Sequence, residues 1–236
     1  MSKKVSISVV IAAYNEAKYI KTVLLALQSQ TVKDYELIVV DNNSSDDTSR
    51  IASDMGAKVY LEKQQGYVFA VERGLREATG DILAVTDSDT SPDPDWLEKI
   101  LNAFEDKSVV AVTGSVKYKD AGFLGNLLTY PVYTIFLWAN FLVGKPHMTG
   151  TSLAMRRETY RKAGGLDTRY KISADVEIGL RLKKYGKVVF MPTLSVVASS
   201  RRWSSQKGHN FFKYTKAYFG TVWFGKPPLE DLKPIR

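Results

Sequence analysis

Short apolar runs rich in β-branched residues alternate with stretches of helical periodicity along the first half of the chain. The apolar runs cover residues 5–11, 36–40, 58–61, 82–85 and 109–112. The helical stretches between them cover residues 17–30, 45–55, 67–78 and 95–104. Continuous apolar strands separated by helices are typical of a mostly parallel sheet that is covered on both faces. We therefore expect an α/β fold in which helices flank a mostly parallel central sheet.

Polar residues follow three of these predicted strands, at the point where each apolar run ends. They occupy positions 14–16, 41–43 and 87–89, with the sequences YNE, DNN and DSD. In open parallel sheets, ligands bind beyond the carboxyl ends of the strands, at the point where the strand order reverses. We therefore expect these three segments to meet at one edge of the sheet and to form a binding site there.

The third segment carries two carboxylates, Asp87 and Asp89, one residue apart. Alternate side chains of an extended chain point the same way, so both carboxylates can hold one Mg²⁺ or Mn²⁺ ion and leave positions open for phosphate oxygens. A solvated acidic turn is the alternative interpretation. The chain has no G-x-G-x-x-G after its first strand and no P-loop, so a diphosphate would need a metal and basic side chains.

Composition narrows the chemistry further. The 236-residue chain is 44% hydrophobic, has no cysteine and only two histidines, so a metal ion is expected to have oxygen ligands. Its formal charge is +8; residues 201–236 hold eight Lys/Arg and two Asp/Glu, which gives +6 there and +2 elsewhere. A basic segment of this kind fits a nucleic acid, anionic lipid headgroups, a substrate diphosphate or a solvated face.

The beginning of the chain has some features of a secretion signal, with two lysines followed by an apolar run. The run is short and β-branched, and it ends in Tyr14, Asn15 and Glu16 without a small-residue cleavage site. A buried strand explains it better. We expect a cytoplasmic protein.

Five segments together resemble the family 2 glycosyltransferases, which have the GT-A fold. In order along the chain these are residues 9–16 (VVIAAYNE), 38–48 (IVVDNNSSDDT), 78–89 (ATGDILAVTDSD), 150–167 and 175–182 (DVEIGLRL). Their order and spacing agree with the family, and they extend over most of residues 5–203. The resemblance implies a GT-A fold with a Rossmann-like nucleotide-binding half and an acceptor half.

The resemblance also implies roles for individual residues. Tyr14, Glu16 and Asp41 would contact the nucleotide of a UDP- or GDP-sugar donor, whereas Asp87 would contact its ribose and diphosphate. Asp87 and Asp89 would hold the metal ion. Family members often have Pro at position 12, Arg-Asn at 71–72 and Glu at 174, where this chain has Ala12, Val71-Glu72 and Ala174. The differences at positions 71–72 and at position 174 change the polarity near the predicted cleft.

By the same resemblance, Asp175 would be the catalytic base. An incoming hydroxyl must lose a proton as it attacks the anomeric carbon, which calls for a carboxylate within hydrogen-bonding reach. Asp175 also stands at the start of a predicted helix, where aspartate is a common cap, so a structural role is the alternative. Glu177 is the second choice for the base. Attack opposite the leaving group predicts inversion at the anomeric carbon.

Arg201, Arg202 and Trp203 precede a polar stretch that could close over the diphosphate. Guanidinium groups match phosphate geometry, and the indole could stack on the sugar or shield the site. A surface cluster is the alternative interpretation. His209 is a candidate metal ligand on the same segment, although a lone histidine is more often structural.

No charged residue occurs between Asp120 and Lys145, and most side chains in this interval are apolar. Residues 121–144 fit a membrane span, an amphipathic helix or helix pair at a membrane surface, or a packed core helix. A span would put Asp87 and Asp175 on opposite sides of the membrane. A surface location, together with the basic and aromatic residues after 206, favours a lipid-linked acceptor and peripheral contact with the cytoplasmic face of a membrane.

We divide the chain into a nucleotide-sugar-binding half (1–115), an acceptor and catalytic-base half of the same domain (116–205), and a basic aromatic tail (206–236). The main hypothesis is an inverting, metal-dependent glycosyltransferase. The rivals are a sugar-nucleotide or phosphate-transfer enzyme, a nucleic-acid-binding module that uses the tail, and a lipid-surface scaffold. The nucleic-acid hypothesis leaves the ordered carboxylates unexplained, so we expect no nucleic-acid partner.

Overall fold

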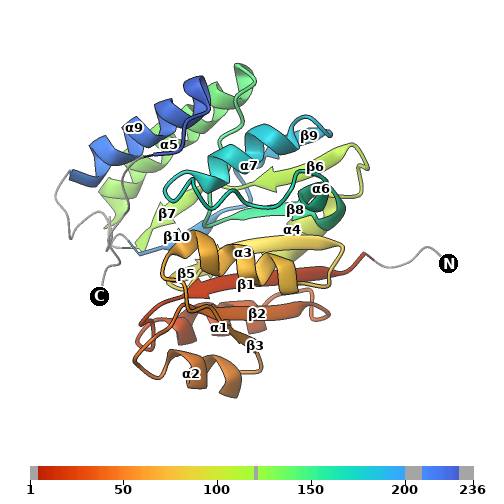
Figure 1. Ribbon diagram of the computed structural model, residues 1–236, viewed down its shortest axis with the longest axis vertical. Coiled ribbons are helices and arrows are strands. Elements are labelled where there is room, and N and C mark those ends of the chain that lie inside the picture. The colour runs from red at the N-terminus through yellow and green to blue at the C-terminus, as the bar shows by residue number, and fades with distance from the viewer. Residues whose placement is uncertain (1–4, 120–121, 200–208, 229–236) are drawn as a thin grey trace.

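The computed structural model describes residues 5–119, 122–199 and 209–228 of the chain. A seven-stranded sheet, in the order β3-β2-β1-β4-β8-β6-β9, forms the centre of the molecule, and helices cover both of its faces (Figure 1). A separate three-stranded sheet has the order β5-β10-β7. The predicted α/β fold with a mostly parallel central sheet is confirmed.

The first half of the chain builds four neighbouring parallel strands. These strands are β1 (Ile7–Ala13), β2 (Glu36–Asp41), β3 (Lys58–Leu61) and β4 (Ile82–Asp87). Their connecting helices are α1 (Ile20–Gln28), α2 (Thr48–Asp54) and α3 (Tyr67–Glu77), and α4 (Trp96–Ala103) follows the short strand β5 (Thr90–Pro92). The strand order reverses between β1 and β4, and this reversal places the predicted switch point there.

Every residue of β1 is buried because each face of the sheet has its own hydrophobic core. Val9 and Ile11 point into the core under α1 and α4, which includes Trp96. Val10 and Ala12 point into the core under α3 and α7. This two-sided burial explains why the strand is a continuous apolar run and does not alternate with polar residues.

The second half adds strands of both directions and the remaining helices. The strands are β6 (Val109–Thr113), β7 (Val116–Tyr118), β8 (Leu153–Arg156), β9 (Lys187–Phe190) and β10 (Val196–Ala198). The helices are α5 (Gly122–Leu142), α6 (Arg157–Lys162), α7 (Ala174–Leu182) and α9 (His209–Phe224). Strand β8 runs antiparallel to both β4 and β6, with Leu153 opposite Val85. The segment before β8 therefore arrives at the edge where β4 ends.

Helices α5 and α9 lie side by side at one end of the molecule (Figure 1). The rings of Phe136 and Tyr218 are 5.5 Å apart, and the Tyr218 hydroxyl donates to the side-chain oxygen of Asn140. On another side of α5, Leu137 is fully buried. None of the helices in the described part of the chain has the length and apolar character that a membrane span requires.

At the amino ends of the strands, Glu36 connects β1, β2, β3 and the loop after α3. Its carboxylate accepts hydrogen bonds from the Ser8 hydroxyl (2.6 Å) and the Thr79 amide (2.8 Å), and it pairs with the Lys58 ammonium (2.7 Å). Desolvation opposes ionisation of Glu36, but the hydrogen bonds from Lys58, Ser8 and Thr79 outweigh it and lower the pKa to about 2. The ionised carboxylate therefore stabilises the fold.

We predict that Glu36→Gln lowers the free energy of unfolding by about 1–3 kcal/mol at pH 7. Because the folded pKa lies below the ordinary value of 4.5, the contribution of Glu36 is present at neutral pH and is lost as the pH falls toward 2. Urea denaturation at several pH values measures this. Glu105→Gln, on an exposed residue, is the control, and equal losses in both variants would contradict the prediction.

Candidate active site

The loops that follow β1 and β2 are joined by hydrogen bonds. The Asn15 amide donates to the Ser44 hydroxyl (2.9 Å), the Asn15 side-chain oxygen accepts from the Ser45 amide (2.9 Å), and the Glu16 amide donates to the Thr48 hydroxyl (2.8 Å). Asn15 has a φ of 54°, a conformation that asparagine tolerates better than most residues. This arrangement leaves its neighbours Tyr14 and Glu16 partly exposed at the sheet edge.

Asp41 and Asp87 end the strands on either side of β1. In the sheet register Asp41 lies opposite Ala13, and Asp87 lies opposite Ala12. Asp41 is only 6% exposed, and its two carboxylate oxygens accept hydrogen bonds from the Ser44 amide (3.1 Å) and the Ser49 hydroxyl (2.8 Å). The expected meeting of the three polar segments at one edge is confirmed, and Asp41 also fixes the loop that follows it.

Buried threonine hydroxyls stabilise the turn that carries Asp87 and Asp89. Thr86 and Thr90 are fully buried with their hydroxyl oxygens 2.7 Å apart, and the Thr90 hydroxyl donates to the Asp87 carbonyl (2.8 Å). The two aspartates remain partly exposed. One Asp87 carboxylate oxygen accepts a hydrogen bond from the Tyr67 hydroxyl (2.9 Å).

This pair of carboxylates fits a hard divalent cation. Mg²⁺ is usually held by one or two carboxylates together with substrate phosphates and water. Partly exposed oxygens on a fixed turn satisfy that requirement. Within the part of the chain that the structure describes, no three or more His, Cys, Asp or Glu side chains gather as a metal site. A cation at this turn would therefore share its coordination with the substrate.

Asp175 lies in the first turn of α7, after the cap residue Ser173. One carboxylate oxygen accepts from the Gly150 amide and the other from the Val176 amide, both at 2.9 Å. Burial raises the pKa of Asp175 to about 6, with a smaller contribution from the charge of Asp87, whereas the amide hydrogen bonds oppose the rise. Asp175 thus lies within electrostatic reach of Asp87, although 88 positions separate them in sequence.

Tyr67 and Gly150 lie between these two carboxylates, and neither residue was among the site residues expected from the sequence. A Cβ atom on Gly150 would lie 3.4 Å from an Asp175 carboxylate oxygen and 3.5 Å from the Tyr67 hydroxyl oxygen. Tyr67 begins α3 directly after Gly66, which has a φ of 138°. A tyrosine that follows a glycine at a predicted helix start is the local signal that the sequence offers for Tyr67.

Buried hydroxyl groups hold the segment that contains Gly150. The Thr149 amide donates to the Thr113 hydroxyl (2.8 Å), and the Thr113 hydroxyl donates to the Ser152 carbonyl (3.0 Å). The Ser152 hydroxyl accepts from the Trp96 indole (3.0 Å) and donates to the Leu194 carbonyl (3.1 Å). These contacts fix the approach of β8 to the sheet, and with it the amide that binds Asp175.

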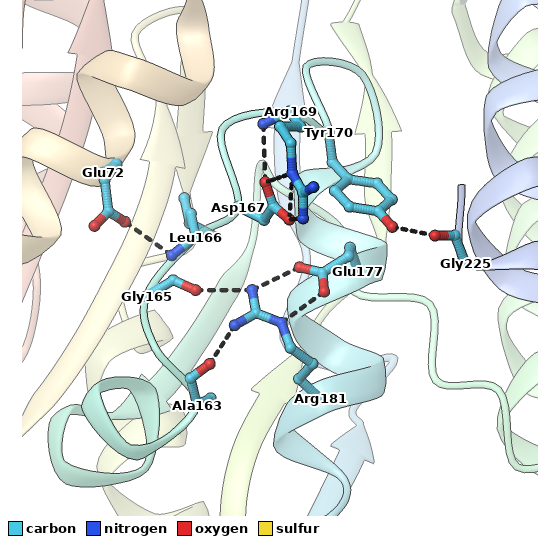
Figure 2. A network of polar contacts seen from close by, with 10 residues as sticks. All are labelled: Glu72, Ala163, Gly165, Leu166, Asp167, Arg169, Tyr170, Glu177, Arg181 and Gly225. Atoms are coloured by element: carbon cyan, nitrogen blue, oxygen red, sulfur yellow. Dashed lines mark hydrogen bonds and ion pairs between the residues drawn. The ribbon is translucent and has the colours of Figure 1, made fainter. Parts of the chain in front are cut away.

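Glu177, the second choice for the catalytic base, forms an ion pair with Arg181. Both of its carboxylate oxygens accept from the Arg181 guanidinium at 2.6 Å, and the same guanidinium donates to the carbonyls of Ala163 and Gly165 (Figure 2). The side chain of Glu177 is 13% exposed. Glu177 therefore fastens α7 to the loop after α6.

At positions 71 and 72 this chain has Val-Glu, where family members often have Arg-Asn. The side chains of Val71 and Glu72 contact other parts of the protein, so they do not change the polarity near the predicted cleft as expected. Val71 is buried in the core beneath α3. Glu72 accepts a hydrogen bond from the Tyr160 hydroxyl. It also accepts one from the Leu166 amide at 2.9 Å, which Figure 2 shows. Its carboxylate anchors the loop after α6. Arg201, Arg202 and Trp203 lie outside the described residues, as does the side chain of His209.

The order of the mixed sheet, together with the solved structures described below, identifies a GT-A fold. Residues 8–164 match the sequence profile described as glycosyl transferase family 2. The chain therefore belongs to glycosyl transferase family 2.

Two curated relatives show how far the similarity extends. The chain is 28% identical to the dolichol-phosphate mannosyltransferase of Pyrococcus furiosus over 239 residues, covering 93% of this chain and 65% of that protein. It is 38% identical to glycosyltransferase AglE of Haloferax volcanii over 120 residues, covering 48% of this chain and 40% of that protein. The chain thus spans less than two thirds of the length of either relative.

Two solved structures share the fold. The mannosyltransferase PcManGT from Pyrobaculum calidifontis, in complex with GDP-Man and Mn²⁺, matches with a TM-score of 0.73 and 21% identity over 99% of this chain and 67% of its own. Glucosyl-3-phosphoglycerate synthase from Mycobacterium tuberculosis, in complex with Mn²⁺, UDP and glucosyl-3-phosphoglycerate, matches with a TM-score of 0.63 and 23% identity over 95% of this chain and 81% of its own.

We predict that Asp87→Asn lowers the pKa of Asp175, because it removes a neighbouring negative charge that disfavours ionisation. Carboxyl-carbon NMR titration in metal-free buffer measures the shift. Asp54→Asn changes the charge equally on an exposed position of α2 and serves as the control. An unchanged Asp175 titration in Asp87→Asn would show that the two carboxylates do not interact.

Proposed function

We propose that the chain is an inverting, metal-dependent glycosyltransferase that moves a sugar from a UDP- or GDP-sugar to an acceptor hydroxyl or phosphate. The observation that carries the proposal is the meeting of Asp87 and Asp175, with Tyr67 and Gly150 between them, at the carboxyl edge of the sheet. The Asp87 carboxylate suits the diphosphate side of the reaction, and the Asp175 carboxylate suits the acceptor side. Family membership supports this division.

The donor nucleotide would lie along the ends of β1 and β2. Tyr14 and Glu16 are partly exposed there, and Asp41 has a fixed carboxylate beside them. These groups offer a ring face and hydrogen-bond acceptors to a base, which does not choose between uracil and guanine. A UDP- or GDP-sugar donor is also supported by the fold neighbours, whose bound ligands are GDP-Man in one structure and UDP in the other.

Asp89 is the proposed direct ligand of Mg²⁺ or Mn²⁺, and Asp87 is proposed to be shared between the metal and the donor. A divalent cation bound there would neutralise the charge that develops on the departing diphosphate. Asp87 also accepts the hydrogen bond of the Tyr67 hydroxyl, which fixes the position of one of its carboxylate oxygens. Both neighbouring structures contain Mn²⁺, and this agrees with the donor set of this chain.

Asp175 is the proposed catalytic base. With a pKa of about 6 it is mostly ionised at pH 7, yet it is a stronger base than an ordinary aspartate. It would take the proton of the acceptor hydroxyl while the acceptor oxygen forms a bond to the anomeric carbon and the carbon–phosphate oxygen bond breaks. The electron pair of that bond leaves with the nucleoside diphosphate. A single displacement of this kind inverts the anomeric configuration.

A lipid-linked acceptor, used peripherally at the cytoplasmic face of a membrane, is the proposed acceptor class. It is supported by the similarity along most of the chain to a protein named as a dolichol-phosphate mannosyltransferase. It is also supported by the absence of charged residues from positions 121–144. A sugar-nucleotide or phosphate-transfer enzyme would release pyrophosphate or phosphate, so analysis of the released product separates it from a glycosyltransferase.

We expect UDP or GDP to raise the melting temperature of the purified protein only when Mn²⁺ or Mg²⁺ is present, because a ligand that binds the folded state stabilises it. Asp89→Ala should abolish the metal-dependent shift while the unliganded protein still melts cooperatively. Asp93→Ala, four positions away, is the matched control. Shifts that are the same with and without metal would contradict the role of Asp89.

We expect Asp175→Asn to reduce sugar transfer by at least about 100-fold, which is the usual contribution of a general base. The variant should keep the metal-dependent nucleotide shift. Glu177→Gln is the matched control on the same helix, and it should retain transfer per folded molecule because Glu177 pairs with Arg181. The rate is measured as release of the nucleoside diphosphate in reactions that contain extracts with the acceptor.

The pH dependence gives a second readout for Asp175. Transfer by the unsubstituted protein should fall as the pH drops through about 6, because Asp175 then gains a proton and can no longer accept one. The residual rate of Asp175→Asn should lack this step. A step of equal size in that variant would assign the titration to another group.

A further inference from the structure

The paired helices α5 and α9 expose large apolar side chains that the proposed chemistry does not use. We call this surface the α5–α9 face and define it by six residues that are each more than half exposed. They are Ile135 (66%), Leu142 (81%), Val143 (68%), Phe219 (51%), Trp223 (62%) and Phe224 (71%). Single exposed apolar residues are ordinary, but a group on two adjacent helices marks an interaction surface.

The most exposed members meet where the two helices end. Lys145 follows α5, and its ammonium donates to the Val222 carbonyl on α9 (3.4 Å) and lies 5.5 Å from the centre of the Trp223 ring. Leu142 and Val143 precede Lys145 with only Gly144 between them, and Phe224 follows Trp223. The ends of α5 and α9 therefore form one exposed apolar surface, and Lys145 links the two helix ends.

The charged residues on and directly after the two helices of the α5–α9 face have a single sign. Neither α5 nor α9 contains an Asp or Glu residue, and residues 178–229 contain ten Lys and Arg and no acidic residue. Lys216 on α9 and Lys226 just after it are exposed. Exposed aromatic and aliphatic side chains next to lysines, without carboxylates, are typical of helices that lie in the headgroup layer of an anionic membrane.

We infer that the α5–α9 face docks onto an anionic lipid bilayer, with both helices lying along its surface. A second copy of the chain is a poorer occupant, because a two-fold interface through this face would bring the same lysines from both copies together. An anionic bilayer instead offers phosphates to the lysines and acyl chains to the apolar residues. The inference rests on the peripheral membrane contact proposed above and deepens it by naming the face that makes the contact, whereas it does not depend on the sugar-transfer chemistry.

The face is connected to the candidate site through the C-terminal half of α9. The Thr221 hydroxyl lies 2.6 Å from the hydroxyl of Ser173, the residue that precedes α7, and both residues are buried. The Tyr170 hydroxyl donates to the Gly225 carbonyl (2.6 Å; Figure 2). A docked face would thus place the Asp175 side of the site near the headgroups, and this consequence also rests on the proposed role of Asp175.

The experiment is co-sedimentation of the full chain with phosphatidylcholine vesicles, with and without phosphatidylglycerol. We expect binding that is stronger to the anionic vesicles and weaker at high salt. The double variant Trp223→Ser with Phe224→Ser should bind roughly tenfold more weakly or worse, because it removes apolar surface that the bilayer would bury. Leu25→Ser with Leu61→Ser is the matched control, since both leucines are 49% exposed on α1 and β3.

Charge reversal tests the electrostatic part separately. Lys216→Glu with Lys226→Glu should lose most of the preference for anionic vesicles, whereas Lys18→Glu with Lys21→Glu, which changes the net charge equally near α1, should keep it. Equal loss in both pairs would reduce the effect to net charge and would overturn docking through this face.

Failure of the inference can be told from failure of the proposed function. The Trp223 and Phe224 variant should keep the metal-dependent nucleotide shift, and Asp89→Ala should keep vesicle binding. No binding to either vesicle by a folded protein would overturn the inference. A dimer in solution that the Trp223 and Phe224 variant converts to a monomer would assign the face to a second copy instead, and would overturn it too.

Discussion

The candidate site depends on the group of buried hydrogen bonds around Ser152. Its hydroxyl joins the Trp96 indole to the Leu194 carbonyl, and its own carbonyl accepts from the Thr113 hydroxyl. Ser152 is fully buried, so loss of one partner would leave a polar atom without water, at a cost of about 1–3 kcal/mol. This requirement fixes where β8 begins, and therefore where the Gly150 amide meets Asp175. The position of the Asp175 carboxylate at the site therefore depends on the buried hydroxyl groups of Ser152 and Thr113.

The elements of the first half could be predicted from sequence because each strand is buried on both faces and each helix is amphipathic. The range 58–61 agrees with β3, and the start of α3 at Tyr67 agrees as well. Helices α1 and α2 begin three residues later than the pattern suggested, at Ile20 and Thr48, because the residues before them form loops joined by side-chain hydrogen bonds. Such loop contacts have no period in the sequence.

The site was predictable in part, for the same physical reason. Asp41 and Asp87 follow strands that pair with β1, so parallel geometry alone brings them to one edge. The proximity of Asp175 to Asp87 depends on β8 running antiparallel between β4 and β6, and the apolar run of that strand does not reveal its direction. Glu72 shows that a polar residue can also mislead the prediction. Its polarity suggested a position near the cleft, but its hydrogen-bond partners are Tyr160 and Leu166.

The connection of α7 to α9 also determines the order in which the molecule can be completed. Strands β1 to β4 pair with one another within the first 87 residues, so the nucleotide side has its parallel strand pairs early in synthesis, and only β4 still waits for its second neighbour, β8. The segment that precedes Asp175 gains its last contacts only when Thr221 and Gly225 have been made. A chain that emerges from the ribosome amino end first would assemble its donor side well before its acceptor side.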